Sequence, residues 1–134
     1  MRGEINYQER AKQQILFSGM RWGTKSPTDF DGVVDIDDTI WVIFEIKLKG
    51  VEIPTGQRIA LERAIDNFSS AFCKKTNKQK VAICFLAEHT TPVEDPVMAI
   101  DCVVTRYYYC GEWKETTGNI KLGNAIDGFI GKHK

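Results

Sequence analysis

A run of apolar residues from Ile40 to Ile46 sets the strongest limit on the fold of this chain. Alternate side chains of a β-strand point to opposite faces of the sheet. Both alternating sets of this run are apolar until Glu45, so we expect a strand in the centre of a sheet that is covered on both faces. Glu45 and Lys47 then emerge together on one face at the end of the strand.

The residues on either side of this run predict a hairpin and a helix. Phe30 to Val34 is expected to form the antiparallel partner, and Asp35 to Asp38 between the two arms contains turn-forming aspartates. After the second arm, the residues from Pro54 to Gly56 open a helix, with Thr55 expected as its N-cap.

Helices and strands are expected along the whole chain. The expected elements are a helix over 4–18, strands over 30–34 and 40–46, a helix from 55 with an apolar stripe reaching Phe72, a strand over 81–87, a long strand over 97–109 that turns at Cys110-Gly111 into Trp113, and a short helix over 122–130. This order predicts a single compact α/β domain over residues 1–134, with a mixed central β-sheet flanked by helices. Its core is α-β-β-α-β, followed by a C-terminal β-hairpin and a short helix.

The composition excludes several classes of function. Eighteen basic and eighteen acidic residues give a formal net charge of zero, which argues against a histone-like wrapper or a basic-armed nucleic-acid coat. No apolar run reaches the roughly twenty residues that span a bilayer, and the N-terminus lacks the apolar centre of a secretory signal. We therefore expect a cytoplasmic protein with no membrane partner.

The end of the hairpin carries the candidate chemistry, in Asp31, Glu45 and Lys47. Asp31 precedes Glu45 by fourteen positions, as a hairpin of these strands requires, and neighbouring strands lie about 4.8 Å apart. Two carboxylates this close repel unless a cation separates them, and oxygen ligands suit Mg²⁺ or Mn²⁺. Lys47 would orient or help to deprotonate a water, or stabilise charge on a phosphate. The set fits metal-assisted phosphodiester hydrolysis, although an acid-x-base tripeptide can also be a plain polar strand end.

Basic residues precede and follow this group in the sequence. Arg21 and Lys25 lie in the loop before the first arm, and Arg58 lies in the first turn of the helix after the second arm. Lys74 and Lys75 belong to a lysine cluster in the linker after that helix. All five are candidates for contacting a DNA backbone, and a solvated loop is the ordinary alternative for the cluster.

The residues from Pro27 to Gly32, which read PTDFDG, and those from Trp41 to Lys47, which read WVIFEIK, resemble the core of the PD-(D/E)XK nuclease superfamily. The chain looks most like the Holliday-junction-resolvase-like and small phage-encoded members. The resemblance covers about residues 4 to 87. It implies a Mg²⁺-dependent DNA endonuclease, with Mn²⁺ as the alternative ion, that acts as a homodimer on duplex or branched DNA in a bacterium or a phage-infected host.

The resemblance also assigns roles to residues of the hairpin. It implies that Asp31 and Glu45 bind the divalent metal and that Lys47 is the catalytic lysine. Ile46, which lies between the last two, is included as a metal-contacting position. The proline of the superfamily's name is not adjacent to Asp31, because Pro27 precedes Asp29. Either aspartate therefore fits the ligand position, and we prefer Asp31.

Two further residues are assigned by resemblance from the helices. Many such nucleases place a glutamine near the site in the helix after the E-x-K motif, and Gln57 matches that position. Many also add a glutamate from the first helix, for which Glu9 is the first choice and Glu4 the second. A non-catalytic nucleic-acid- or protein-binding module that keeps the fold is the alternative function, and an interaction domain with a coincidental motif is another. The presence of all three charged core residues argues against a decayed site.

Overall fold

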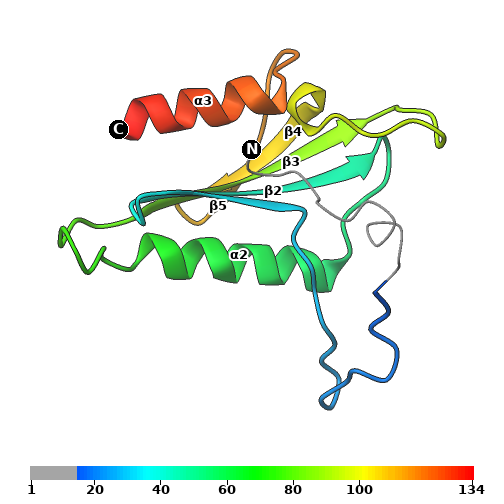
Figure 1. Cartoon of the computed structure of the whole chain (residues 1–134), viewed down its shortest axis with the longest axis horizontal. Helices are drawn as coiled ribbons and strands as arrows, with labels where there is room; N and C mark the ends of the chain where they lie inside the picture. Colours follow the sequence, from blue (N-terminus) through cyan, green and yellow to red (C-terminus); the bar gives the residue numbers. More distant parts are fainter. Residues whose placement is uncertain (1–14) are drawn as a thin grey trace, which may run out of the picture.

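The computed structural model describes residues 15–134, which form a mixed five-stranded sheet with α3 on one face and α2 on the other (Figure 1). The strands, in their order across the sheet, are β1 (Gly32–Ile36), β2 (Ile40–Leu48), β3 (Val81–His89), β4 (Val103–Tyr109) and β5 (Glu112–Glu115). The helices are α2 (Thr55–Ser69), α3 (Leu122–His133) and a short 3₁₀ turn, η1 (Ala99–Asp101). β2 and β3 are parallel and the other neighbours are antiparallel, so the expected α/β class with a mixed sheet is confirmed.

β2 is the buried central strand that its sequence predicts. Its Ile43 packs with Leu61 and Ile65 of α2, while Ile40 and Val42 belong to the core on the α3 side. β2 and β3 run parallel, so the chain must cross over between their ends, and α2 makes that crossover along one face of the sheet. The N-terminal turn of α2 is thereby placed beside the C-terminal end of β2.

The β1–β2 hairpin forms, with its first arm two residues later than expected. The turn is made by Asp37 and Asp38, whose φ angles are 51° and 59°, a left-handed conformation that aspartate tolerates. Asp35 and Ile36 therefore remain in the strand. Gly32 pairs with Phe44, and a Cβ at this glycine would lie 2.0 Å from the Phe44 ring, so close packing against glycine helps to hold this register.

Four other local expectations differ from the structure. Pro54 is the N-cap of α2 and Thr55 its first residue, because the chain turns into the helix at the proline without a side-chain cap. Phe72 lies beyond α2 and is 56% exposed, so it is not part of the buried stripe. The long strand expected over 97–109 is interrupted by η1 and begins at Val103. Residues 15–18 are not helical, and the rest of the helix expected over 4–18 lies outside the described residues.

The terminal helix covers the opposite face of the sheet, as its sequence pattern predicts. Leu122 and Phe129 of α3 are buried, with Ile126 and Ile130 packed at the margin of the same core. α3 continues three residues past the expected end, to His133. Within residues 15–134, neither helix is long and apolar enough to cross a bilayer.

Candidate active site

Asp31 and Glu45 meet at the open end of the β1–β2 hairpin. Asp31 directly precedes β1, and continuing the register past Gly32 and Phe44 places it opposite Glu45. The backbone N–H of Asp31 donates to Glu45 Oε2 over 3.3 Å, and the backbone N–H of Ile46 donates to Asp31 Oδ2 over 2.7 Å. Each carboxylate is therefore held by the backbone of the other strand, and the two acids predicted to converge do so.

Gln57 holds Glu45 from the first turn of α2. The Glu45 side chain is 2% exposed, which is unusual for a glutamate, and Gln57 is also buried. Gln57 Nε2 donates to Glu45 Oε1 over 2.8 Å and to the backbone carbonyl of Asp29 over 3.2 Å. One amide group thus joins α2, β2 and the segment before β1, which fixes the direction of the Glu45 carboxylate.

Lys47 is the basic member of the group. Its Nζ lies 3.5 Å from Glu45 Oε1, and its side chain is 28% exposed. The two residues share a face because they are two positions apart on one strand. The group thus has one ammonium, which lies against Glu45, and two carboxylates, so the formal charge of Asp31, Glu45 and Lys47 together is negative.

The electrostatics of Glu45 reflect this shortage of positive charge. Burial raises the pKa of Glu45 above its ordinary value, and the negative charge of Asp31 raises it further. The Asp31 N–H, the Lys47 ammonium and the Gln57 amide oppose that rise without cancelling it. A divalent cation between the carboxylates would remove the repulsion that remains.

The residues present fit a hard divalent cation of the Mg²⁺ type. Residues 15–134 contain no group of three or more His, Cys, Asp or Glu side chains that could hold a metal, so the site offers two carboxylates. Mg²⁺ is usually bound through one or two carboxylates, with water and substrate phosphate as its other ligands. Gln57 Oε1 is buried with no hydrogen-bond partner among the described residues, which leaves one more oxygen beside Glu45. Ile46 has only its backbone carbonyl oxygen to offer a metal, because its side chain is apolar, and its N–H donates to Asp31.

The two aspartates before β1 have different relations to Glu45. Asp31 places its carboxylate on the backbone of β2, whereas the contact of Asp29 with the site is made by its backbone carbonyl. This geometry favours Asp31 as the metal ligand. Glu9 and Glu4, the candidates for a third carboxylate, lie outside the described residues.

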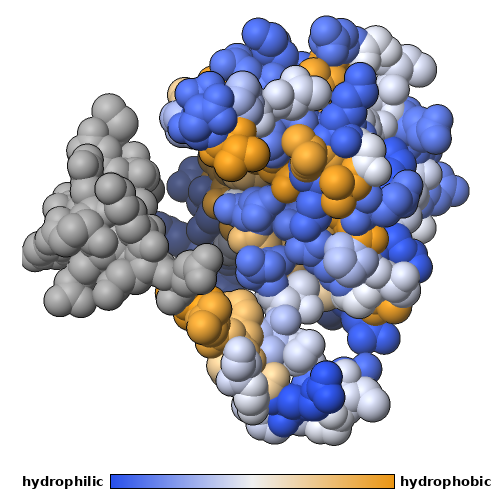
Figure 2. Space-filling model, turned by 90° about the vertical axis from the view of Figure 1, so that its right-hand side faces the viewer, coloured by the Kyte–Doolittle hydropathy of each residue, from blue (hydrophilic) through white to orange (hydrophobic). Residues whose placement is uncertain are grey.

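Arg21 and Lys25 lie in the segment before β1, which projects from the body of the molecule at the end where β2 finishes (Figures 1 and 2). The backbone groups of Trp22 and Lys25 bond to each other in both directions, at 2.8 and 3.0 Å, around a turn that contains Gly23. Figure 2 shows mainly hydrophilic side chains on this end, with hydrophobic ones in separate groups. Both predicted DNA contacts are exposed here, at the same end as the carboxylates.

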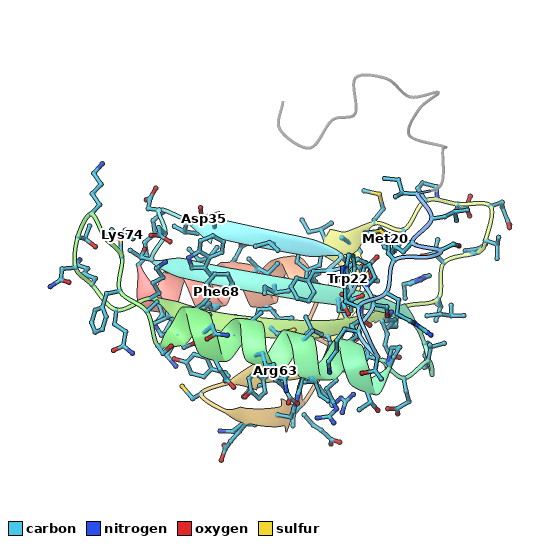
Figure 3. The ribbon with its side chains drawn as sticks, turned by 90° about the horizontal axis from the view of Figure 1, so that it is seen from below. Met20, Trp22, Asp35, Arg63, Phe68 and Lys74 are labelled. Carbon is cyan, nitrogen blue, oxygen red and sulfur yellow. The ribbon has the colours of Figure 1, made fainter. Side chains whose placement is uncertain are left out.

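The other basic candidates are placed differently. Arg58 Nη1 lies 2.7 Å from Glu62 Oε2, so its charge is paired within α2. Lys74 and Lys75 follow α2 in the loop that leads into β3, at the opposite end of the sheet from Met20 and Trp22 (Figure 3). The structure therefore does not bring Lys74 and Lys75 to the carboxylates. Arg58 lies at their end of the sheet, in the first turn of α2, but its charge is paired with Glu62.

Arg106 is a basic residue near the site that the sequence analysis missed. β2, β3 and β4 place Glu45 opposite Leu86, and Leu86 opposite Arg106, so the three side chains share one face of the sheet. The Arg106 guanidinium lies over the Trp113 ring, 5.6 Å from its centroid. No local motif marks Arg106, because its position depends on the pairing of β4 with β3 across a register shift after Leu86.

Comparisons of the chain with known protein families, with curated proteins and with solved structures gave no match in any of the three. The resemblance to PD-(D/E)XK nucleases therefore rests on the sequence motif and on the arrangement of Asp31, Glu45, Lys47 and Gln57.

Proposed function

We propose that the protein is a divalent-metal-dependent DNA endonuclease of the PD-(D/E)XK type. The observation that carries the proposal is the buried Glu45 carboxylate, which lies against the Asp31 backbone and 3.5 Å from the Lys47 ammonium. Burying an acid beside a second acid is unfavourable for folding. An arrangement of this kind is typical of a site that binds a cation for its function.

Each residue of the group has a role that its geometry supports. Asp31 and Glu45 would hold Mg²⁺ or Mn²⁺, which when bound lowers the pKa of a water and offsets negative charge in the transition state. Lys47 would donate its N–H groups to the attacking water or to a phosphate oxygen, on the exposed side of Glu45. Gln57 would keep the Glu45 carboxylate in one orientation throughout the reaction.

The distribution of charge supports selectivity for DNA shape rather than strong general binding. The net charge is zero, and Arg58 is paired with Glu62, so few phosphates can be neutralised near the site. Branched DNA, such as a four-way junction, is accordingly the substrate that we test beside duplex DNA. The proposed enzyme acts as a homodimer, as the resemblance implies and because one site would have to cut the two strands in turn. Sedimentation analysis with and without DNA tests this state.

Cleavage assays test the proposed function directly. Supercoiled plasmid and a synthetic four-way junction are incubated with Mg²⁺ or Mn²⁺ and with the wild type, Glu45→Ala or Lys47→Ala. We expect the wild type to cleave and both variants to lose roughly 10²–10³-fold in rate, the usual effect of removing one electrostatic contributor. The matched controls are Asp127→Ala and Lys132→Ala, which remove exposed charges on α3 and should cleave normally.

Equal nicking by all five proteins, or nicking by none of them, would contradict the proposal. Binding of the junction in a gel-shift assay without cleavage by the wild type would instead support the non-catalytic binding module.

A further inference from the structure

A hollow of about 470 Å³ adjoins Lys47 at the end of the sheet. β2 ends at Leu48 and β3 at His89, and α2 begins only at Thr55. The C-terminal residues of both strands therefore extend beyond the start of the helix on this face of the sheet. The loop over 50–53 lines one part of the hollow, and residues 103–106 with 115, 116 and 118 line another. A hollow of this size is within the range of about 300–1,000 Å³ that small-molecule sites occupy. It is therefore large enough for one nucleotide and continuous with the candidate active site through Lys47.

Arg106 supplies an anchor for an anion at this hollow. It lies two strands from Glu45 in the same row of the sheet, or about 10 Å at the usual strand spacing. Within residues 15–134 no carboxylate forms an ion pair with Arg106, while the Trp113 ring supports its guanidinium. A supported guanidinium with unpaired N–H groups is well suited to binding a phosphate. Arg106 therefore offers guanidinium N–H groups to an anion, whereas the guanidinium of Arg58 is paired with Glu62.

The rest of the lining suits a base better than a second phosphate. Ile53 and Leu86 supply apolar surface, and Thr116 Oγ1 is buried with no hydrogen-bond partner among the described residues. Three carboxylates also line the hollow, against the two basic groups of Lys47 and Arg106. The three are Glu52, Glu88 and Glu115. Carboxylate oxygens accept hydrogen bonds from the amino groups of bases and repel phosphates, and the Thr116 hydroxyl can bond to the edge of a base.

We propose, building on the nuclease function above, that this hollow binds one unpaired nucleotide of the DNA substrate beside the bond that is cut. Lys47 and Arg106 hold its phosphate, and its base enters the hollow against Ile53 and Leu86. A paired base cannot do so, because it is stacked and its hydrogen-bonding edge is occupied. The preferred substrate is then DNA with an unpaired or extruded nucleotide, and not fully paired duplex.

Two variants and two matched controls test the site. Val51 lines the hollow and is 50% exposed, so Val51→Trp fills the hollow without disturbing the core. Val93→Trp makes the same change at a fully exposed residue outside the lining. Arg106→Ala removes the anchor, and Arg63→Ala removes an exposed arginine on α2 (Figure 3).

The first measurement compares cleavage of a matched duplex, the same duplex with one unpaired nucleotide, and a four-way junction. We expect the wild type to cut the unpaired and branched substrates about tenfold faster than the duplex, as one charge-assisted contact allows. Val51→Trp and Arg106→Ala should lose this preference, and both controls should keep it.

The second measurement needs no cleavage. 2-Aminopurine at the unpaired position gains fluorescence when it leaves the base stack, and we expect this gain with the wild type and both controls but not with Val51→Trp. Equal cleavage of all substrates, with the same fluorescence for Val51→Trp as for the wild type, overturns the proposal and leaves the nuclease function standing. A fluorescence gain that Val51→Trp abolishes, with no cleavage by the wild type, supports the nucleotide site and overturns the nuclease function.

Discussion

Each end of the β1–β2 hairpin has a carboxylate beside a lysine, but the pKa of the carboxylate is lowered at the turn and raised at the open end. At the turn, Lys80 Nζ lies 2.8 Å from Asp38 Oδ1, and Trp41 Nε1 donates to the same oxygen over 3.3 Å. The hydrogen bond from Lys80 lowers the pKa of Asp38 below its ordinary value. At the open end, burial and Asp31 raise the pKa of Glu45.

This contrast separates charges that help the fold from charges that oppose it. Lys80, which directly precedes β3, stabilises the ionised form of Asp38. The ion pair at the turn therefore favours the folded hairpin. Ionising Glu45 costs stability because its pKa is raised, and a functional cation would offset that cost. Removing the charge of Glu45 should therefore lower activity without lowering stability, whereas removing the charge of Asp38 should lower stability and leave activity unchanged.

The largest effect is expected for Glu45→Gln, which keeps the shape of the side chain and removes its charge. DNA cleavage should fall by roughly 10³-fold, because metal binding and transition-state stabilisation both depend on this carboxylate. The melting temperature without divalent metal should be equal to or higher than that of the wild type. Plasmid nicking and calorimetry measure the two effects. A clearly lower melting temperature would mean that the Gln57 amide, the Asp31 backbone N–H and the Lys47 ammonium fully compensate the charge of Glu45.

The pH dependence of stability sharpens the same comparison. Because the folded state raises the pKa of Glu45, it binds a proton more tightly than the unfolded state. The contribution of Glu45 to stability is therefore most favourable near and below its ordinary pKa of 4.5 and becomes unfavourable as the pH rises through the raised value. The difference in melting temperature between Glu45→Gln and the wild type should shrink from pH 7 to pH 5. A constant difference would count against a raised pKa.

Gln57→Leu should have the next largest effect. Loss of an outer partner of a metal-binding carboxylate typically lowers activity by about 10–100-fold. A buried Glu45 that loses its amide donor should also reduce the free energy of unfolding by about 1–3 kcal/mol. Gln79→Leu is the control, since Gln79 is exposed and its side-chain amide donates to the Ser69 carbonyl, at the opposite end of α2 from Gln57. Equal activities for the two variants would exclude an orienting role for Gln57.

Mg²⁺ should raise the melting temperature by a few degrees. Binding to the folded state at ten times the dissociation constant stabilises it by about 1.4 kcal/mol, and a domain of this size responds by about 2–5 °C per kcal/mol. Asp38→Asn should keep this shift and Asp31→Asn should lose it. A shift that persists in Asp31→Asn would place the cation somewhere else.

The smallest effect is expected for Asp38→Asn, which should lower the melting temperature slightly and leave cleavage unchanged. Because the folded pKa of Asp38 is lowered, its stabilisation is present above the ordinary value of 3.8 and disappears as the pH falls through the lowered one. Denaturation at pH 7 and at pH 2.5 measures the difference from the wild type. A difference that survives at pH 2.5 would indicate lost packing and not lost charge.

The hairpin, the Asp31–Glu45–Lys47 group and Gln57 could be located from the sequence because they depend on local geometry. Alternation along one strand puts Glu45 and Lys47 on the same face, and a hairpin of known spacing puts Asp31 opposite Glu45. Gln57 follows from the family resemblance and from the return of the chain after β2. In the hairpin and at the start of α2, the predicted boundaries differ from the structure by one or two residues, as at Thr55, because several turn-forming residues lie side by side there.

The placement of the other charges depended on which distant elements pair, and the sequence has no local mark for that. Arg106 joins the row of Glu45 because β4 pairs with β3 across a register shift, and Arg58 is paired because Glu62 lies one helical turn further along α2. Lys74 and Lys75 lie far from the carboxylates because α2 carries the chain back along the sheet. Periodicity is a property of each strand or helix alone, whereas the charges around a site come from contacts between segments that only the folded chain brings together.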